Sequence, residues 1–381
     1  MTEGEGRNGE QRTTIADASL CRAGLPAGPI FFDMPRVLEL GLDTFGDVTV
    51  DPSGKPNSHA QVLRDVVTEA VLADQVGVDC IGLGEHHRED FAISTPETVL
   101  AAIAAKTTRI HLGSAVTVLS SDEPVRVFQR FSTLDALSNG RAEIILGRGS
   151  FTESFPLFGY PLDQYEILFE ERLELFAALL EANRTHQPVT WRGRTRAPLN
   201  NQRIYPPTES GALKTWIGVG GSPESVVRAA HYKLPLTLAI IGGDPRRFLP
   251  YVQLYHKELA ARGAEPLPIA VHSPGHIAPT DAEAREELWP AYEKMRNRIG
   301  RERGWPPTSR RDFEQEVEHG SLYCGAPETV AKKIANTARA LGLDRFTMKY
   351  SSGPLTHALQ LRSIELYGRQ VIPRVREMLA G

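Results

Sequence analysis

Strand patterns and helical patterns alternate along this chain after residue 36, and this alternation is the feature that most limits its fold. The strands are predicted at residues 37–45, 81–84, 111–118, 141–149, 214–220, 236–241, 267–278 and 345–350. The helices are predicted at residues 63–71, 95–107, 123–138, 169–180, 223–233, 248–259, 281–303, 327–341 and 355–379. Apolar residues at helical spacing mark the helices, and short apolar runs mark buried strands. Eight strands with interleaved helices favour an α/β fold of the (β/α)8 TIM-barrel type over an open doubly wound sheet.

The first 35 residues do not follow this pattern. They are polar, rich in Gly and Arg, and without periodicity, so residues 1–35 are predicted to be a disordered or loosely docked extension. Residues 36–381 are then predicted to form the barrel. Met34 precedes the first strand directly, which makes it an alternative start of translation that the intact mass of the native protein would test.

Two further segments interrupt the alternation within the barrel. Pro, Asn and Arg accumulate in residues 183–212, which include a predicted hairpin at 189–193, and this segment follows the fourth helix. A second insertion, around residues 305–307, precedes the eighth strand. We expect the first insertion and the loop after His276 to shape the substrate pocket, since long loops of this kind carry function.

Charge and cysteine content exclude several classes of protein. A net charge of −4 argues against general affinity for nucleic acid or anionic membrane. No apolar run approaches the roughly 20 residues that span a bilayer, and no secretory signal is expected at the start. Cys21, Cys80 and Cys324 are odd in number, far apart and without CxxC spacing. We therefore expect reduced thiols in a cytoplasmic protein.

The predicted strand at 81–84 runs directly into Glu85, His86 and His87. In a parallel barrel the chemistry lies where the strands end, so these side chains are candidates for a site. Adjacent strand residues point to opposite sides, so one histidine should face the site and the other should pack behind it. The alternative is a strand end with two exposed or hydrogen-bonded histidines. A metal site would need further ligands that this spacing lacks.

A second candidate lies where the strand at 214–220 meets the next helix. Gly220 and Gly221 allow the backbone to approach a ligand closely. Ser222 then opens the helix, whose free N–H groups and partial positive charge suit a phosphate. Ser225 would add a hydroxyl donor to the same anion. The alternative is an ordinary capped helix, because Ser followed by Pro is a common helix start.

A third candidate is Arg148, which stands between two glycines at the end of the strand at 141–149. A guanidinium at a strand exit is suited to an anion or to the edge of a ring. A surface ion pair is an equal alternative on spacing alone.

Seven motifs in fixed order carry a family resemblance. They are 82–87 (GLGEHH), 112–116 (LGSAV), 135–141 (DALSNGR), 147–149 (GRG), 158–160 (FGY), 220–225 (GGSPES) and 228–230 (RAA). In this order the chain resembles bacterial luciferase and its flavin-dependent monooxygenase relatives over roughly residues 37–379. It differs from luciferase at Gly147, where luciferase has a reactive cysteine. It also differs at Tyr165 and Glu166, where luciferase has a phosphate-binding arginine.

The resemblance implies a barrel that binds FMN at the carboxyl ends of its strands. His86 matches the catalytic histidine beside the flavin, and a near-normal pKa would let it exchange protons around neutral pH. The resemblance also implies a non-proline cis peptide between Ala115 and Val116, against the flavin ring. The implied cofactor contacts are Ala115, Val116, Arg148, Gly220, Gly221, Ser222 and Ser225. No metal is implied.

The activity implied by the resemblance is that of an FMN-dependent monooxygenase. Reduced FMN would react with O2 to form a C4a-(hydro)peroxide, which oxygenates a small organic substrate. NAD(P)H or a partner flavin reductase would supply the reduced flavin, and we expect a homodimer. Two alternatives stay open: a deazaflavin-dependent oxidoreductase on the same barrel, and a flavin-binding protein without turnover.

Overall fold

The computed structural model describes residues 37–149 and 151–380. The predicted extension at 1–35 and the alternative start at Met34 lie outside the described residues.

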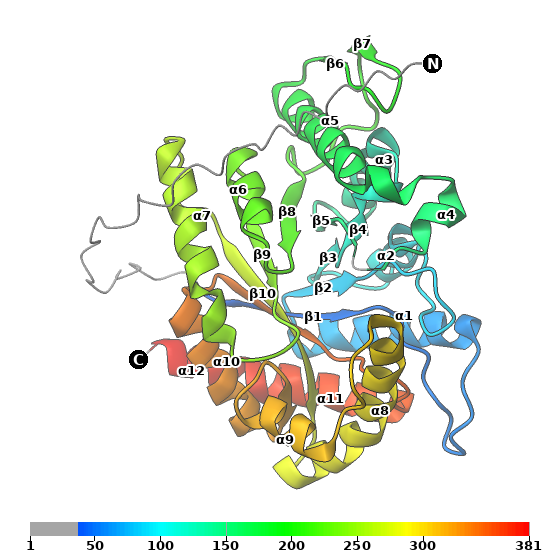
Figure 1. Cartoon of the computed structure of the whole chain (residues 1–381), viewed down its shortest axis with the longest axis vertical. Coiled ribbons are helices and arrows are strands. Elements are labelled where there is room, and N and C mark those ends of the chain that lie inside the picture. The colour runs from blue at the N-terminus through cyan, green and yellow to red at the C-terminus, as the bar shows by residue number, and fades with distance from the viewer. Residues whose placement is uncertain (1–36, 150, 381) are drawn as a thin grey trace, which may run out of the picture. The chain divides into compact units, whose positions relative to one another are not determined.

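Eight parallel strands close into a barrel, which confirms the predicted fold class (Figure 1). The barrel strands are β1 (Glu39–Thr44), β2 (Cys80–Leu83), β3 (His111–Ser114), β5 (Ala142–Gly147), β8 (Lys214–Val219), β9 (Leu236–Ala239), β10 (Ile269–Ile277) and β12 (Arg345–Lys349). They pair in that order, and β12 returns to β1 with Asp43 opposite Lys349. Because the order around the barrel follows the chain, β3 and β5 face β10 and β12 across it.

Helices follow most of the strands and surround the barrel (Figure 1). The longer ones are α1 (His59–Val76), α2 (Pro96–Ala104), α3 (Pro124–Leu137), α5 (Tyr165–Thr185), α6 (Pro223–His231), α7 (Leu249–Ala261), α8 (Asp281–Arg303), α10 (Pro327–Leu341), α11 (His357–Leu366) and α12 (Ile372–Ala380). Local sequence explains their ends. The hydroxyl of Ser58 accepts a hydrogen bond from the Gln61 N–H and caps α1, while Gly77 ends it in the left-handed conformation.

Several elements within the barrel chain differ from the prediction. The closing helix expected at 355–379 is divided into α11 and α12 by a π-helical segment at Tyr367–Val371. The strand expected at 111–118 is divided into β3 and β4 (Thr117–Val118), because the chain turns at Ala115 and Val116. Helices α4 (Ser154–Phe158) and α9 (Arg310–Glu318) and strand β11 (Tyr323–Gly325) were not predicted. These elements are short, and α9 buries only Phe313 and Val317, so its helical pattern is weak. The hairpin of the first insertion is confirmed as β6 (Val189–Trp191) paired with β7 (Leu199–Gln202).

The main hydrophobic core fills the space in and around the barrel strands, where Leu40, Leu112 and Ile144 are completely buried. A smaller cluster joins α8, α9 and β11 through Leu288 and Phe313. The second insertion is therefore a packed unit with its own apolar contacts.

A buried ion pair crosses the lower part of the barrel. The Arg345 guanidinium donates to both carboxylate oxygens of Glu143, at 2.5 and 2.9 Å, and to Glu39 at 2.6 Å. Burial alone would raise the pKa of Glu143, but Arg345 holds it below its ordinary value. This charge pair faces the deep end of the cavity described below.

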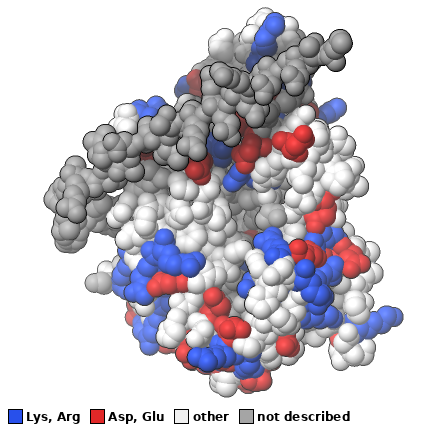
Figure 2. Space-filling model, viewed as in Figure 1, with Lys and Arg blue, Asp and Glu red and all other residues white. Residues whose placement is uncertain are grey.

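Within the described ranges, no helix is long and apolar enough to cross a bilayer. Figure 2 shows Lys and Arg side chains interspersed with Asp and Glu on the described part of one face. Cys80 and Cys324 are buried free thiols.

Candidate functional site

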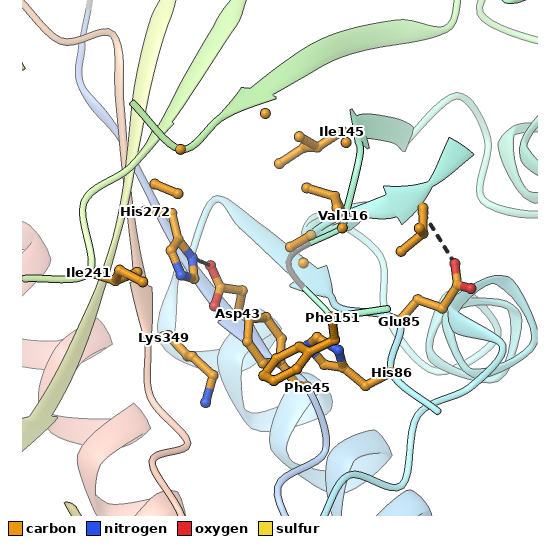
Figure 3. Close-up of a pocket in the computed structure, with 18 of the residues that line it drawn as sticks. Asp43, Phe45, Glu85, His86, Val116, Ile145, Phe151, Ile241, His272 and Lys349 are labelled. Carbon is orange, nitrogen blue, oxygen red and sulfur yellow. Dashed lines mark hydrogen bonds and ion pairs between the residues drawn. The ribbon is translucent and has the colours of Figure 1, made fainter. Parts of the chain in front are cut away.

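A cavity of about 510 Å³ lies at the carboxyl ends of the barrel strands (Figure 3). This volume is within the range of small-molecule and cofactor sites. Among the predicted site residues, His86, Ala115, Val116, Arg148, Gly220 and Ser225 line it. Gly221 and Ser222 are not among the residues that line it.

One wall of the cavity is formed by Ala115 and Val116, and the peptide bond between them is cis, as predicted. Two glycines make room for this turn. A Cβ atom at Gly147 would lie 2.5 Å from Val116 Cγ2, and one at Gly218 would lie 3.1 Å from Val116 Cγ1. The glycine that replaces the luciferase cysteine therefore allows Val116 to pack against β5.

The opposite wall is polar, and no motif in the sequence predicted it. Figure 3 shows Asp43, His272 and Lys349 across the cavity from Val116. His272 Nδ1 lies 2.6 Å from Asp43 Oδ2, and Lys349 Nζ lies 2.8 Å from Asp47 Oδ2. These residues come from or directly follow β1, β10 and β12. Asp43, His272 and Lys349 are polar or charged side chains at positions of predicted barrel strands, and this placement was the sequence signal that could have identified them.

His86 lies among phenylalanine rings. Its ring centroid is 4.7 Å from Phe45, 4.6 Å from Phe91 and 5.0 Å from Phe151. Burial, and then the positive charge of Lys349, lowers the pKa of His86 to about 3. The expectation of a near-normal pKa was therefore wrong, and the imidazole is neutral at neutral pH. Within the described part of the chain, its ring nitrogens have no hydrogen-bond partner.

His87 also lines the cavity, so the expectation that only one of the two histidines would face it was wrong. Strand β2 ends at Leu83, and the alternation of strand side chains no longer applies to the loop that follows. His87 Nε2 lies 2.8 Å from Glu85 Oε1, and its ring packs edge-on against Phe158.

At the start of α6, the predicted phosphate-binding residues come together. Ser222 caps the helix by accepting a hydrogen bond from the Ser225 N–H at 3.2 Å, and its own hydroxyl donates to Ser225 Oγ at 2.9 Å. Arg148 donates to the same oxygen at 3.4 Å and Arg228 at 3.2 Å. Arg228 was part of a quoted motif but was not predicted as a site residue.

Acidic residues of α5 hold these two arginines. Arg148 pairs with Glu166, and Arg228 pairs with Glu170. Glu166 is 59% exposed at its side chain, so water screens its charge and it can move away from a bound anion. Arg228 supplies a second cation where α5 lacks the arginine of luciferase. Glu224, beside the helix start, is exposed.

The rim of the cavity comes from α8 and the residue Trp305, not from the first insertion. Tyr292, Met295 and Ile299 of α8 line the cavity, whereas residues 183–212 do not contribute to it. The prediction for the first insertion was wrong because its hairpin packs on α5, away from the strand ends. Arg88 ties the loop after β2 to α8 through Glu302.

Comparison of the sequence with known proteins identifies the family of this chain. A family model described as luciferase-like monooxygenase matches residues 44–345. Two uncharacterized proteins of Sinorhizobium fredii, y4vJ and y4wF, are 32% and 34% identical over 32% and 46% of this chain. Those matches cover only 35% and 50% of the two relatives. The 4-hydroxyprotoasukamycin monooxygenase of Streptomyces nodosus subsp. asukaensis is 26% identical over 81% of this chain and 85% of that protein.

Solved structures share the fold. Monooxygenase RslO1 from Streptomyces bottropensis has a TM-score of 0.77 at 23% identity, with 88% of this chain and 99% of that chain covered. The oxygenating constituent of 3,6-diketocamphane monooxygenase from Pseudomonas putida, in complex with FMN, has a TM-score of 0.72 at 19% identity, covering 89% and 99%. An F420-dependent secondary alcohol dehydrogenase has a TM-score of 0.67 at 17% identity, covering 89% and 99%.

Proposed function

The chain belongs to the luciferase-like monooxygenase family, and from this premise we propose that it is an FMN-dependent monooxygenase acting on a small organic substrate. Bound reduced FMN would supply the activation of O2 and the transfer of one oxygen atom. The residues of this chain would bind the cofactor, orient the substrate and keep water away.

The observation that carries the proposal is the convergence of donors on Ser225 Oγ. A serine hydroxyl has two lone pairs, yet Ser222, Arg148 and Arg228 all donate toward this one oxygen. Ser225 is also buried, at 4% exposure, at the start of a helix. Three donors thus meet at one oxygen with two lone pairs, and the helix start adds a partial positive charge. A phosphate group supplies the missing acceptors.

The rest of the flavin would extend from this cluster along the wall of Ala115 and Val116. The cavity is large enough for a cofactor, and its walls near His86 are aromatic. As a neutral imidazole, His86 would donate a hydrogen bond to the flavin or the substrate, or accept one from it. We keep it as the proposed catalytic residue beside the cofactor.

The phosphate site is tested by comparing FMN with riboflavin, which lacks the phosphate. Flavin fluorescence quenching gives both affinities. Ser222→Ala and Ser225→Ala should each weaken FMN binding by about 10- to 100-fold, as expected for a lost hydrogen bond to a charged group. Their riboflavin affinity should stay close to that of the parent protein.

Ser222→Ala also removes a helix cap, so it needs a matched control. Ser58→Ala removes an equivalent cap, because Ser58 Oγ accepts from the Gln61 N–H at the same 3.2 Å. Both variants should lose about 1 kcal/mol of stability, but only Ser222→Ala should lose FMN affinity. Equal FMN affinity in all three serine variants and the parent would place the phosphate elsewhere.

The choice between FMN and a deazaflavin is settled by the same titration. One structural neighbour, the F420-dependent secondary alcohol dehydrogenase, is in complex with an F420-acetone adduct. Tighter binding of F420 than of FMN would favour the deazaflavin-dependent alternative. Oxygen incorporation into a substrate with supplied reduced FMN, compared with NAD(P)H and oxidised FMN, distinguishes an enzyme from a passive flavin carrier. It also shows whether a separate reductase must supply the reduced flavin.

A further inference from the structure

The polar wall opposite Val116 holds a histidine and a carboxylate that the cofactor site does not use. Asp43 is 1% exposed and comes from β1, while His272 comes from β10 and keeps 13% of its side chain exposed toward the cavity. Their 2.6 Å contact joins Nδ1 of the ring to Oδ2 of the carboxylate (Figure 3). Because a carboxylate only accepts, Nδ1 donates to it.

This contact fixes which nitrogen of His272 is available. With the proton on Nδ1, a neutral ring presents the lone pair of Nε2. Within residues 37–149 and 151–380, Nε2 has no hydrogen-bond partner. Phe45 stacks on the ring, with centroids 6.1 Å apart and an angle of 12° between the planes, and so holds its orientation. The arrangement presents a fixed acceptor to the cavity.

Other charged groups share this wall with the ring. Asp43 and Asp47 contribute two carboxylates, while Lys349 contributes one ammonium group, which is bound to Asp47 and to Ser351. His86 has no such carboxylate contact, because phenylalanine rings surround it.

We propose that His272, positioned by Asp43, is a base that binds and deprotonates an acidic hydroxyl group of the substrate, and that the substrate is an apolar, aromatic-sized molecule with a phenol or enol hydroxyl. The substrate O–H bond breaks, its electron pair stays on oxygen, and the proton moves to Nε2. The remaining lining, including Ile145, Ile241 and Phe151, suits an apolar ring.

In the proposed reaction, this base would prepare the substrate for oxygenation. A phenolate or enolate is electron-rich at the neighbouring carbon, which is where an oxygen atom supplied by reduced flavin and O2 would be accepted. The strand order places the base on β10, across the barrel from β3 and the proposed flavin wall. This inference rests on the proposed function for the use of the base, but the hydroxyl site itself is tested without any flavin.

The test uses 4-nitrophenol as the probe, since its phenolate absorbs visible light and its neutral form does not. The purified chain is titrated at a pH below the probe's own pKa, and 4-nitroanisole, which has no ionisable hydroxyl, is the matched ligand control. Bound 4-nitrophenol should show the phenolate band and should bind about 10- to 100-fold more tightly than 4-nitroanisole.

Three variants separate the roles of the residues. His272→Asn keeps an amide donor toward Asp43 but removes Nε2, so the phenolate band should disappear while 4-nitroanisole affinity stays within about threefold. Asp43→Asn keeps a side chain of the same size and should reduce the phenolate fraction of the bound probe, which a purely structural role would not do. His87→Gln, in another cavity-lining histidine, should keep the band.

An undiminished phenolate band in His272→Asn would overturn the proposal. Binding of 4-nitrophenol only in its neutral form, equal affinity for 4-nitroanisole, or no binding of either probe would overturn it as well. If the protein binds FMN no more tightly than riboflavin but still shows the phenolate band, only the proposed cofactor site is refuted. Intact FMN binding without a band would refute only the hydroxyl site.

Discussion

The burial of His86 predicts a specific pH dependence of stability. In the unfolded chain this histidine takes up a proton as the pH falls below about 6.5, whereas in the folded chain its pKa is lowered to about 3. Between these two values the unfolded state binds more protons, so stability falls as the pH is lowered through this window. Each pH unit below about 6.5 costs about 1.4 kcal/mol. From about pH 7 to about pH 5, His86 should therefore remove about 2 kcal/mol of stability.

The variant that isolates this effect is His86→Phe, which keeps an aromatic ring next to Phe45 and Phe91 but cannot be protonated. The free energy of unfolding is measured by urea denaturation at both pH values for parent and variant. The parent should lose about 2 kcal/mol more than His86→Phe between them. His319→Phe is the control, because that side chain is 81% exposed and lies outside the cavity. Equal pH dependence in parent and His86→Phe would refute the account of a buried neutral imidazole.

Three other substitutions test the site and its support. His86→Ala should keep most FMN affinity but lower single-turnover oxygenation by about 100- to 10,000-fold; an unchanged rate would exclude a catalytic role. His87→Ala should affect turnover less and cost about 1–3 kcal/mol in urea denaturation, because the half-buried Glu85 loses a partner. Arg345→Met should cost about 3–5 kcal/mol, because it leaves the Glu143 charge buried, and adding Glu143→Leu should recover most of that loss. No recovery in the double variant would contradict this reading of the ion pair.

The fold could be predicted because its strands are continuous apolar runs separated by periodic helices. This pattern is strong for β5 and β8, which are buried on both faces. The short elements α9 and β11 could not be predicted, since they are stabilised by contacts with α8 and not by a pattern of their own.

The candidate site was predictable where a local motif carries it. The cap at Ser222 and the hydroxyl of Ser225 are each set by a few consecutive residues. The cis peptide at Val116 was expected from the family resemblance alone, because its residues otherwise predict a continuous strand. The pairing of Asp43 with His272 was not predictable, because 229 positions separate the two residues and only barrel closure brings them together. The pKa of His86 likewise depends on burial by the rings of Phe45 and Phe151, which the residues next to His86 in the sequence do not reveal.

The proposed function depends on FMN binding with its phosphate at the start of α6. A crystal structure of the chain with FMN would show whether it binds there. We expect the phosphate within hydrogen-bond distance of Ser225 Oγ and of Arg148 or Arg228, with the flavin ring against Ala115 and Val116. A phosphate bound away from α6, or a flavin ring outside the cavity, would contradict it.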